Sequence, residues 1–434
     1  MRHKAPPYMH DVLPVPPSVD AWLHTPRWRA LERIFRDVCR LHGYREIRTP
    51  VMESTDLFAR SVGAGTDIVS KEMFTFTDRG ERSMTLRAEG TAPVVRAFLE
   101  NGLASGGSMT KLYYIATIYR YEHGQRGRYR EHQQTGIEAL GGASPAVDAE
   151  VIALAVAFLT RLGIADVALR LNSVGCPTCR PGYLAALLAF AEKRLGLMSR
   201  DNRRRFEENP LRMLDSKDPD DHAALEGAPV LRSYLCAECG DHFTELRAHL
   251  DDLGIAYELD DRLVRGLDYY TRTAFEFVSP QLGAQDVIGG GGRYDGLIEQ
   301  CGGPPTPGVG FGIGTERCLM VLDRLEASMM LEDERPIAYV ISPGAATSRR
   351  AVAMVAELRR AGISAETDYL GRSIKAQMRT ANKLGAQWAV ILGEVELARN
   401  AAAVKNLRNS DEQREIPISG LVSFILDHLH NRVE

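Results

Sequence analysis

Residues 111–142 read KLYYIATIYRYEHGQRGRYREHQQTGIEALGG. Tyrosine and isoleucine recur across residues 111–119, which predicts a half-buried strand, and residues 132–140 read as a second strand that returns beside it. A solvated hairpin is the commoner explanation of a charged loop taken alone. A strand, a cationic loop and a returning strand can also hold a polyanion against a rigid sheet. The loop is cationic because its charged residues are Arg120, Glu122, Arg126, Arg128 and Arg130.

The composition is that of an ordinary globular protein with two or three domains. The chain has 434 residues, of which 44% are hydrophobic and 25% charged. No apolar run approaches the roughly 20 residues that a membrane span needs, and the first residues lack the apolar core of a secretory signal. We therefore expect a cytoplasmic protein without a membrane segment. The net charge of -4 argues against a nucleic-acid coat protein, although residues 336–434 are mildly basic.

Three further stretches concentrate unusual residues. In residues 87–93, RAEGTAP, Glu89 lies at a strand exit and Thr91 is expected to be the N-cap of a helix. The pair could orient a cationic ligand or could simply cap the helix. The other two stretches are residues 263–277, LVRGLDYYTRTAFEF, and the glycine-rich segments IGGGGRYDG (288–296) and GVGFGIGTER (308–317).

The glycine pattern does not match the common nucleotide-binding motifs. Alternating glycines in residues 308–314 lie on one face of a strand and leave its backbone bare for a flat ligand. The strand-turn-helix setting of a dinucleotide site is missing, and no GxxxxGK[ST] occurs. Arg317 follows at the start of an apolar helix, where an unpaired guanidinium would be costly.

Seven cysteines include the pairs CPTC and CAEC. Paired CxxC segments are how a tetrahedral zinc ion is usually bound, although residues 180–235, which separate them, exceed the usual finger spacing. Structural zinc and reduced thiols both fit this pattern. The candidate ligands are Cys176, Cys179, Cys236 and Cys239, while Cys39, Cys301 and Cys318 read as small core residues.

The remaining segments suggest how the chain is divided. A helix is expected after Thr25 as N-cap, up to Leu41, followed by a strand whose Pro50 places it at an edge open to a second subunit. Residues 63–71 read as a mobile loop. From residue 336 onward, strands and helices alternate as in a compact α/β domain of about 100 residues.

These motifs together resemble the class II aminoacyl-tRNA synthetases. The Arg-x-Glu with its arginine-rich loop is similar to their motif 2, the glycine strand leading to Glu-Arg to motif 3, and the Pro50 strand to motif 1. The blocks RGLDYYTRTAFEF, GGGGRYDGL, TLRAEGTA and LGRSIKAQMRTANKLGA resemble the histidyl-tRNA synthetase family over nearly the whole chain. One departure is Tyr8, which stands where that family often has glycine.

The resemblance implies an α+β catalytic domain with the class II antiparallel sheet and flanking helices, a helical insertion, and a C-terminal α/β anticodon-binding domain. The expected boundaries are residues 1–170 and 257–330 for the catalytic domain, 171–256 for the insertion, and 336–434 for the anticodon-binding domain. It also implies a homodimer that activates L-histidine with ATP and Mg²⁺ and transfers it to the 3′ end of tRNA(His).

The chemistry explains why arginines are needed. The attacking carboxylate is ionised at neutral pH, so no protein base is required, and positioning and positive charge must lower the barrier. The resemblance implies Arg120, Arg265 and Arg317 as catalytic residues. Among these, Arg120 and Arg317, with Glu122 on adenine, would bind ATP.

For histidine, Glu138 can accept a hydrogen bond from one ring N–H, and Tyr270 can address the other ring nitrogen. The full set that the resemblance implies for histidine is Glu89, Gly90, Thr91, Arg120, Gln134, Glu138, Arg265, Tyr269 and Tyr270. For the tRNA acceptor end it implies Gln125, Arg126 and Arg128. A stripe of Arg372, Lys375, Arg379 and Lys383 could bind phosphates, although each residue alone reads as a solvated charge.

Two other functions compete with this one. A catalytically inactive synthetase-like regulatory subunit of histidine biosynthesis would resemble the catalytic body, but such proteins lack the tail domain and lose the motif arginines. A protein that only senses histidine or RNA is the third candidate. The intact Arg120, Arg265 and Arg317 favour the enzyme.

Overall fold

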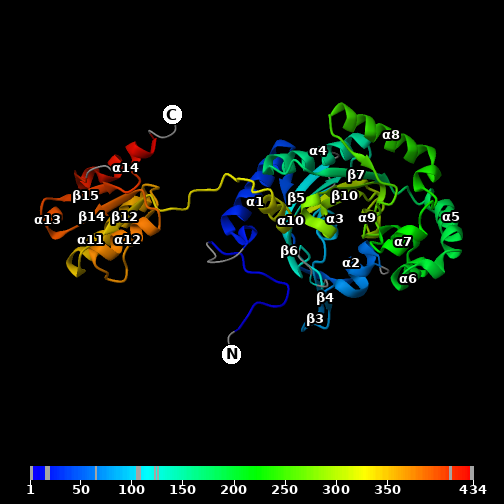
Figure 1. Ribbon diagram of the computed structural model, residues 1–434, viewed down its shortest axis with the longest axis horizontal. Helices are drawn as coiled ribbons and strands as arrows, with labels where there is room; N and C mark the ends of the chain where they lie inside the picture. The colour runs from blue at the N-terminus through cyan, green and yellow to red at the C-terminus, as the bar shows by residue number, and fades with distance from the viewer. Residues whose placement is uncertain are drawn as a thin grey trace. The chain divides into compact units, whose positions relative to one another are not determined.

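The computed structural model describes residues 3–14, 20–63, 66–103, 109–121, 124, 127–409 and 413–430. The chain forms two compact units, Met1–Leu331 and Glu332–Glu434, whose elements are labelled in Figure 1.

The first unit is organised around the predicted hairpin. Its β5 and β6 pair in antiparallel fashion along their whole length, from Thr110 opposite Leu140 to Tyr119 opposite Glu131. They belong to an eight-stranded sheet of the described residues, in the order β1-β5-β6-β11-β10-β9-β7-β8. Only the outermost pairs in this order, β1 with β5 and β7 with β8, are parallel. The strands are β1 (Arg45–Glu46), β5 (Thr110–Tyr119), β6 (Glu131–Leu140), β7 (Ala168–Ser173), β8 (Glu258–Leu259), β9 (Thr271–Val278), β10 (Val287–Arg293) and β11 (Gly308–Gly314).

The two faces of this sheet differ because side chains alternate along each strand. Ile137, Phe311 and Phe275 point to one face, where four helices cover them and complete the main hydrophobic core. These helices are α1 (Thr25–Leu41), α4 (Pro145–Leu162), α8 (Ala237–Asp252) and α10 (Thr315–Arg324). Figure 1 shows α4 and α8 together, and the two helices pack against each other. The other face carries glycines and polar side chains and is therefore available for a ligand.

The remaining elements of the first unit adjoin the polar face. A three-stranded sheet of described residues is formed by β2 (Met52–Ser54), β4 (Ser83–Leu86) and β3 (Thr75–Thr77), next to α2 (Thr55–Val62), α3 (Thr91–Glu100) and α9 (Leu297–Gln300). The expected insertion is helical, and Tyr183 and Leu187 anchor its first helix in a second core. It contains α5 (Arg180–Glu192), α6 (Arg200–Glu208), α7 (Pro219–Ala224) and the 3-10 turns η4 (Leu195–Leu197), η5 (Pro210–Asp215) and η6 (Leu231–Tyr234). Shorter turns elsewhere are η1 (Ala21–Leu23), η2 (Ile68–Glu72) and η7 (Pro280–Gln285).

The second unit is the predicted α/β fold. Its described strands run β13-β12-β14-β15-β16, with β12 parallel to β13 and β14, and with β15 antiparallel to its neighbours. Helices α11 and α14 contribute to the core on one face, and α12 to the smaller core on the other. The elements are β12 (Ala338–Ile341), α11 (Ala345–Arg360), β13 (Ala365–Thr367), α12 (Ile374–Lys383), β14 (Trp388–Ile391), α13 (Glu394–Ala398), β15 (Ala401–Asn406), β16 (Arg414–Pro417), η8 (Ile418–Gly420) and α14 (Leu421–His430).

Three local expectations were wrong in detail. The Pro50 strand is split, because β1 joins the large sheet while β2 joins the small one, with the proline between them. The N-cap of α1 is His24 rather than Thr25. Residues 63–71 were expected to be a loop, but Ile68–Glu72 form the π-helical turn η2, and Ile68 is buried against α2. In the described ranges no helix combines the length and hydropathy that crossing a bilayer requires.

Candidate active site

A cleft of about 1000 Å³ opens on the polar face of the large sheet. Its lining comes from β6, β10, β11, α10, the loop before β9 and the helical insertion. Of the predicted site residues, it brings together Arg120, Arg128, Gln134, Arg265 and Arg317. These residues are up to two hundred positions apart in the chain, so the sheet pairing is what assembles them.

The floor beneath this region is made of glycine backbone. Gly290 and Gly292 of β10 pair with Gly312 and Gly310 of β11, so all four lie side by side on the polar face. A Cβ atom at Gly310 would lie 2.1 Å from Oε2 of Glu138, and one at Gly312 would lie 2.1 Å from Nε2 of Gln134. The predicted alternation of glycines on one face is confirmed, and its reason is the close approach of neighbouring side chains.

Two of the arginines are fixed by backbone carbonyls. Arg120 donates from Nε to the carbonyl oxygen of Ala88 at 2.7 Å, and Arg317 donates from Nε to that of Gly127 at 3.0 Å. His132, which also lines the cleft, is near both charges. Burial, together with the positive charges of Arg120 and Arg317, lowers the pKa of His132 to about 3, so this ring is neutral at physiological pH.

Arg265 forms an ion pair with a carboxylate and has one N–H group without a partner in the described structure. Its Nη1 donates to Glu276, which also lines the cleft. Burial alone would lower the pKa of Arg265, but the Glu276 charge keeps it above its ordinary value. The buried Nε of Arg265 has no hydrogen-bond partner within the described part of the chain. A ligand oxygen is the group that such an N–H needs.

Glu138 lies in a closed polar pocket. Oε1 accepts a hydrogen bond of 2.7 Å from the Thr91 hydroxyl, and Oε2 accepts one from the Tyr294 hydroxyl. Its side chain is almost fully buried, with 1% exposed. Burial raises the pKa of Glu138 to about 8, against the effect of these hydrogen bonds. The Glu138 carboxyl is therefore protonated at neutral pH, and an N–H donor would favour its ionised form.

Glu89 caps the helix that Thr91 was expected to cap. Its carboxylate accepts from the backbone N–H groups of Thr91 at 2.7 Å and Ala92 at 2.5 Å, and the Tyr269 hydroxyl lies 3.4 Å from it. The N-cap position is Gly90, and Thr91 is the first helical residue, so its hydroxyl is free to reach Glu138. A Cβ atom at Gly90 would lie 2.3 Å from the Tyr114 ring, which explains the glycine.

Sequence reasoning missed several residues of this pocket. Tyr114 accepts a hydrogen bond of 2.8 Å from Gln134, and the rings of Tyr269 and Tyr294 meet edge to face at 5.7 Å. Glu316 is fully buried beside Arg317, accepts from the backbone N–H of Gln133 at 2.9 Å, and has its pKa raised to about 8 by burial. Tyr294 and Glu316 stand inside the glycine-rich blocks, so their position was a usable signal. Tyr114 and Glu276 also stand inside stretches that the sequence marks out, residues 111–142 and 263–277, but no role was predicted for them there.

The tip of the arginine-rich loop is only partly described. Glu122, Gln125 and Arg126 lie outside the described residues, whereas Arg128 lines the cleft. Arg130 stacks on Tyr121, with its guanidinium carbon 3.7 Å from the ring centroid, and lies 5.3 Å from the Tyr8 centroid. Tyr8 has a φ of 63°, a conformation in which glycine is unstrained. The departure from the family pattern therefore falls on a residue that gains an aromatic contact at the expense of backbone strain.

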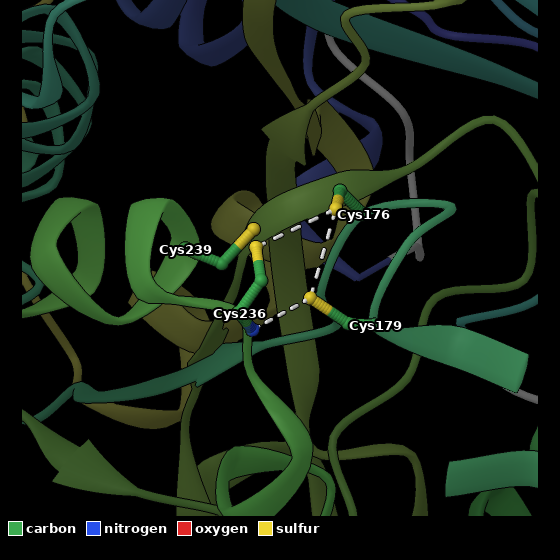
Figure 2. A group of neighbouring side chains, drawn as sticks. All are labelled: Cys176, Cys179, Cys236 and Cys239. Carbon is green, nitrogen blue, oxygen red and sulfur yellow. Dashed lines mark hydrogen bonds between the residues drawn. The ribbon is translucent and has the colours of Figure 1, made fainter. Parts of the chain in front are cut away.

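The four cysteines of the CxxC pairs converge on one point (Figure 2). Cys176 and Cys179 come from the loop between β7 and α5, and Cys236 and Cys239 from the start of α8. Their sulfur atoms all lie within 4.8 Å of one another, with 3.6 Å between Cys176 and Cys179 and 3.9 Å between Cys176 and Cys236. A tetrahedral zinc with Zn–S bonds of about 2.3 Å requires sulfur atoms about 3.8 Å apart. The donor set therefore fits a metal ion of that kind.

Comparison with known proteins decides the family. The family model described as histidyl-tRNA synthetase matches residues 23–178 and 189–318, and the model of the anticodon binding domain matches residues 338–428. The chain belongs to the histidyl-tRNA synthetase family. The predicted class II catalytic domain and C-terminal anticodon-binding domain are thereby confirmed, whereas the exact domain boundaries stay a prediction.

Individual members of the histidyl-tRNA synthetase family match nearly the whole chain. The histidine–tRNA ligase of Desulforamulus reducens is 49% identical over 399 residues, which cover 92% of this chain and 95% of that protein. That of Symbiobacterium thermophilum is 46% identical over 430 residues, covering 98% and 99%. Among solved structures, the apo histidyl-tRNA synthetase of S. aureus has 36% identity and a TM-score of 0.80, covering 98% of this chain and 100% of that one.

Proposed function

We propose that this chain activates L-histidine with ATP to form histidyl-adenylate and then transfers the histidyl group to the 3′ end of tRNA(His). The observation that carries this proposal is the meeting of Arg120, Arg265 and Arg317 in one cleft, beside the pocket of Glu138. It is a site for a polyanion next to a site for a small N–H donor, as the reaction requires. The family relationship supports the same reaction.

The three arginines act by position and charge. The histidine carboxylate attacks the α-phosphate without a protein base, because it is already ionised, and pyrophosphate leaves. Arg120 and Arg265 hold the α-phosphate and the substrate carboxylate, and Arg317 holds the γ-phosphate. The unpartnered Nε of Arg265 supports its part of this assignment. The planar guanidinium can bind two oxygens at once, which lysine cannot do.

ATP enters as its magnesium complex. Mg²⁺ prefers carboxylate, phosphate and water oxygens, and it neutralises phosphate charge when bound. Glu316 is the cleft residue that fits such an ion, since its buried Oε2 has no hydrogen-bond partner among the described residues. A nearby cation would also favour ionisation of a carboxyl whose pKa burial has raised.

Histidine is recognised through both ring nitrogens. Glu138 accepts from one ring N–H, and Tyr270, packed against Gly292 of the floor, addresses the other. Glu89, Thr91 and Gln134 surround the α-amino group, and Gly90 and Tyr269 shape the wall. Because these buried groups would be left unpaired by an apolar amino acid, discrimination of about 10⁴ or more requires no editing domain.

The remaining contacts concern the tRNA and the assembly. The loop bearing Gln125, Arg126 and Arg128 contacts the acceptor end, with Glu122 on the adenine of ATP, and α12 contacts the anticodon stem. The protein acts as a cytoplasmic homodimer, in which the Pro50 segment meets its copy. Val51 and Met52, next to that proline, are 43% and 49% exposed in the single chain.

The four cysteines hold one structural zinc ion. Thiolate donors select zinc among the abundant divalent ions, and four such donors leave no open position for catalysis. The zinc therefore stabilises structure, while the reaction uses Mg²⁺ with ATP.

ATP–pyrophosphate exchange with each amino acid in turn tests the proposal. The wild type is expected to exchange with histidine alone, and Arg265→Ala is expected to lose at least two orders of magnitude in kcat/KM. Arg247→Ala, on α8 outside the cleft, is the matched control and should retain the activity. Folded protein that exchanges with no amino acid would contradict the proposal and favour the inactive regulatory subunit.

A further inference from the structure

The cysteine cluster is connected by hydrogen bonds to the segment that carries Tyr269 and Tyr270. Cys179 is followed by Arg180, whose Nη2 donates to the carbonyl oxygen of Tyr270 and whose Nε donates to that of Val174 at 3.3 Å. One guanidinium thus connects the first CxxC turn to the backbone of the histidine pocket.

A second connection runs through Arg272. Its backbone N–H donates to Gly175 at 2.8 Å, and its carbonyl oxygen accepts from Val174 at 2.7 Å, so it pairs with the loop that leads into Cys176. Its side chain reaches Glu238 and His242, each at 3.5 Å, on the first turns of α8, where Cys236 and Cys239 lie. Arg272 therefore contacts both chain segments that carry the cysteines, although none of its hydrogen bonds among the described residues is to a cysteine itself.

The backbone at this point is strained. Arg272 has a φ of 52°, in the left-handed region that few residues other than glycine adopt. Such a conformation persists only where the surroundings hold it in place, at a cost of roughly 1–3 kcal/mol. The contacts that hold Arg272 come from the loop before Cys176 and from the start of α8. These two segments are about sixty residues apart in the chain and meet at the cysteine cluster.

Among the described residues, the two cysteine-bearing segments meet at the sulfur atoms and through neighbouring contacts such as that of the Tyr183 and Tyr234 rings, whose centroids lie 5.6 Å apart. Between the cysteines of the two segments, the backbone N–H of Cys236 donates to the sulfur of Cys179 at 3.2 Å, and the sulfur atoms of Cys176 and Cys236 lie 3.9 Å apart. Gly175, with a φ of 63°, leaves room for this approach, because a Cβ atom there would lie 2.8 Å from the Cβ of Cys179. A metal ion shared by four thiolates would join the two segments more strongly than these contacts do.

From these contacts we infer that the metal ion at Cys176, Cys179, Cys236 and Cys239 positions Tyr269 and Tyr270 for histidine recognition, through Arg180 and Arg272. The inference rests on the proposed function for what Tyr270 binds. Arg180 and Arg272 are positioning residues here, and the ion takes no part in the reaction. Its loss should weaken histidine binding and leave ATP binding intact, because Arg120 and Arg317 are held by other segments.

The metal is tested first, on the full-length protein. Zinc measured by plasma mass spectrometry after desalting should amount to about one ion per chain. Cys236→Ser with Cys239→Ser should abolish it, and Cys301→Ser, outside the cluster, should retain it. A wild type without metal, whether its thiols are free or joined in disulfides, would overturn the inference.

The coupling is tested by the separate KM values for histidine and ATP in pyrophosphate exchange. Arg180→Ala, which keeps all four cysteines, should retain zinc and raise the histidine KM about tenfold while the ATP KM stays unchanged. Removal of zinc from the wild type by a chelator should give the same pattern, and this arm does not depend on whether the cysteine variants fold. Arg194→Ala, two residues after the end of the same helix and stacked on Phe190, is the matched control.

The two proposals fail in different ways. If Arg180→Ala and zinc removal both leave the histidine KM unchanged, the metal is not coupled to the pocket and the inference is wrong. If the wild type binds zinc but exchanges with no amino acid, the proposed function fails, and the coupling proposal that depends on it falls with it.

Discussion

Glu138 links the chemistry of the pocket to pH. Its pKa of about 8 means that the Glu138 carboxyl is protonated at pH 7, whereas the proposed role in histidine binding needs the carboxylate as acceptor. Binding below pH 8 therefore displaces a proton, so the apparent affinity falls as the pH falls. The imidazole ring of the substrate histidine has an ordinary pKa near 6.5, which lies below the pH range of 7 to 8 considered for Glu138.

We expect the histidine KM in pyrophosphate exchange to rise roughly fivefold when the pH is lowered from 8 to 7. In Glu138→Gln the KM should be high at both values and should lose this pH dependence. Glu299→Gln, at an exposed position on α9, should behave like the wild type. A wild-type KM that is constant across this range would show that Glu138 is already ionised in the empty pocket.

Whether such residues can be predicted from the sequence depends on whether their neighbours in the pocket are close to them in the chain or are brought there by the fold. Glu138 and Tyr270 stand in long blocks with a family pattern, so the sequence was enough to propose them. Tyr114 and Glu276 stand in the same stretches, but they become pocket residues only through strand pairing, of β5 with β6 and of β9 with β10. Thr91 was assigned as a cap because helix signals are local, whereas Glu89 performs the capping from two residues earlier.

Four secondary-structure elements are joined by one buried ionic network. Arg293 of β10 donates to Asp148 of α4 from both Nη2 and Nε, and Asp148 also accepts from Thr273 of β9. His242 of α8 lies 2.9 Å from the same carboxylate. The side chains of Arg293 and Asp148 are 0% exposed. Because both charges are removed from water, burying either one without the other would strongly destabilise the fold.

Arg293→Met should lower the free energy of unfolding of the first unit by about 3–5 kcal/mol, because it leaves the Asp148 charge buried without its partner. Calorimetric unfolding of the full-length protein measures the effect as a lower transition temperature. Arg399→Met, at an exposed ion pair with Glu415, is the control and should have little effect. An Arg293→Met protein with the wild-type transition would mean that His242 alone compensates Asp148.

Secondary-structure elements were largely predictable from the sequence where a periodic pattern of apolar residues extends over a long segment. The helix ending at Leu41, the hairpin and the α/β alternation after residue 336 are all present. The Pro50 segment was not, because its two halves pair with strands of different sheets, and a local pattern cannot state which partner a short strand will find.

The second unit matches the model of the anticodon binding domain, so its exposed basic residues are the candidates for contact with tRNA. On α12, Lys375, Arg379 and Lys383 are exposed, while Gln377 and Ala381 face the interior. The exposed side of the helix is therefore the candidate phosphate-binding stripe. Arg372 differs, since it pairs with Asp368.

Arg379→Glu with Lys383→Glu should raise the tRNA KM in aminoacylation and reduce the slope of its salt dependence by about two. Pyrophosphate exchange, which needs no tRNA, should be unchanged. Arg349→Glu with Arg360→Glu on α11, which packs on the opposite face of the sheet, provides the matched control. Equal effects of the two pairs would indicate a general charge effect rather than a stripe on α12.

The order of strands in the large sheet has a consequence for synthesis on the ribosome. Strand β6 ends at Leu140, but its partner β11 begins at Gly308, so more than half of the first unit must be translated before that edge is covered. Until then the nascent hairpin presents an open strand edge and the apolar residues of its helix-facing side. We expect the growing chain to bind chaperones over this interval and to complete the sheet around Glu138 only when β11, which ends at Gly314, has left the exit tunnel.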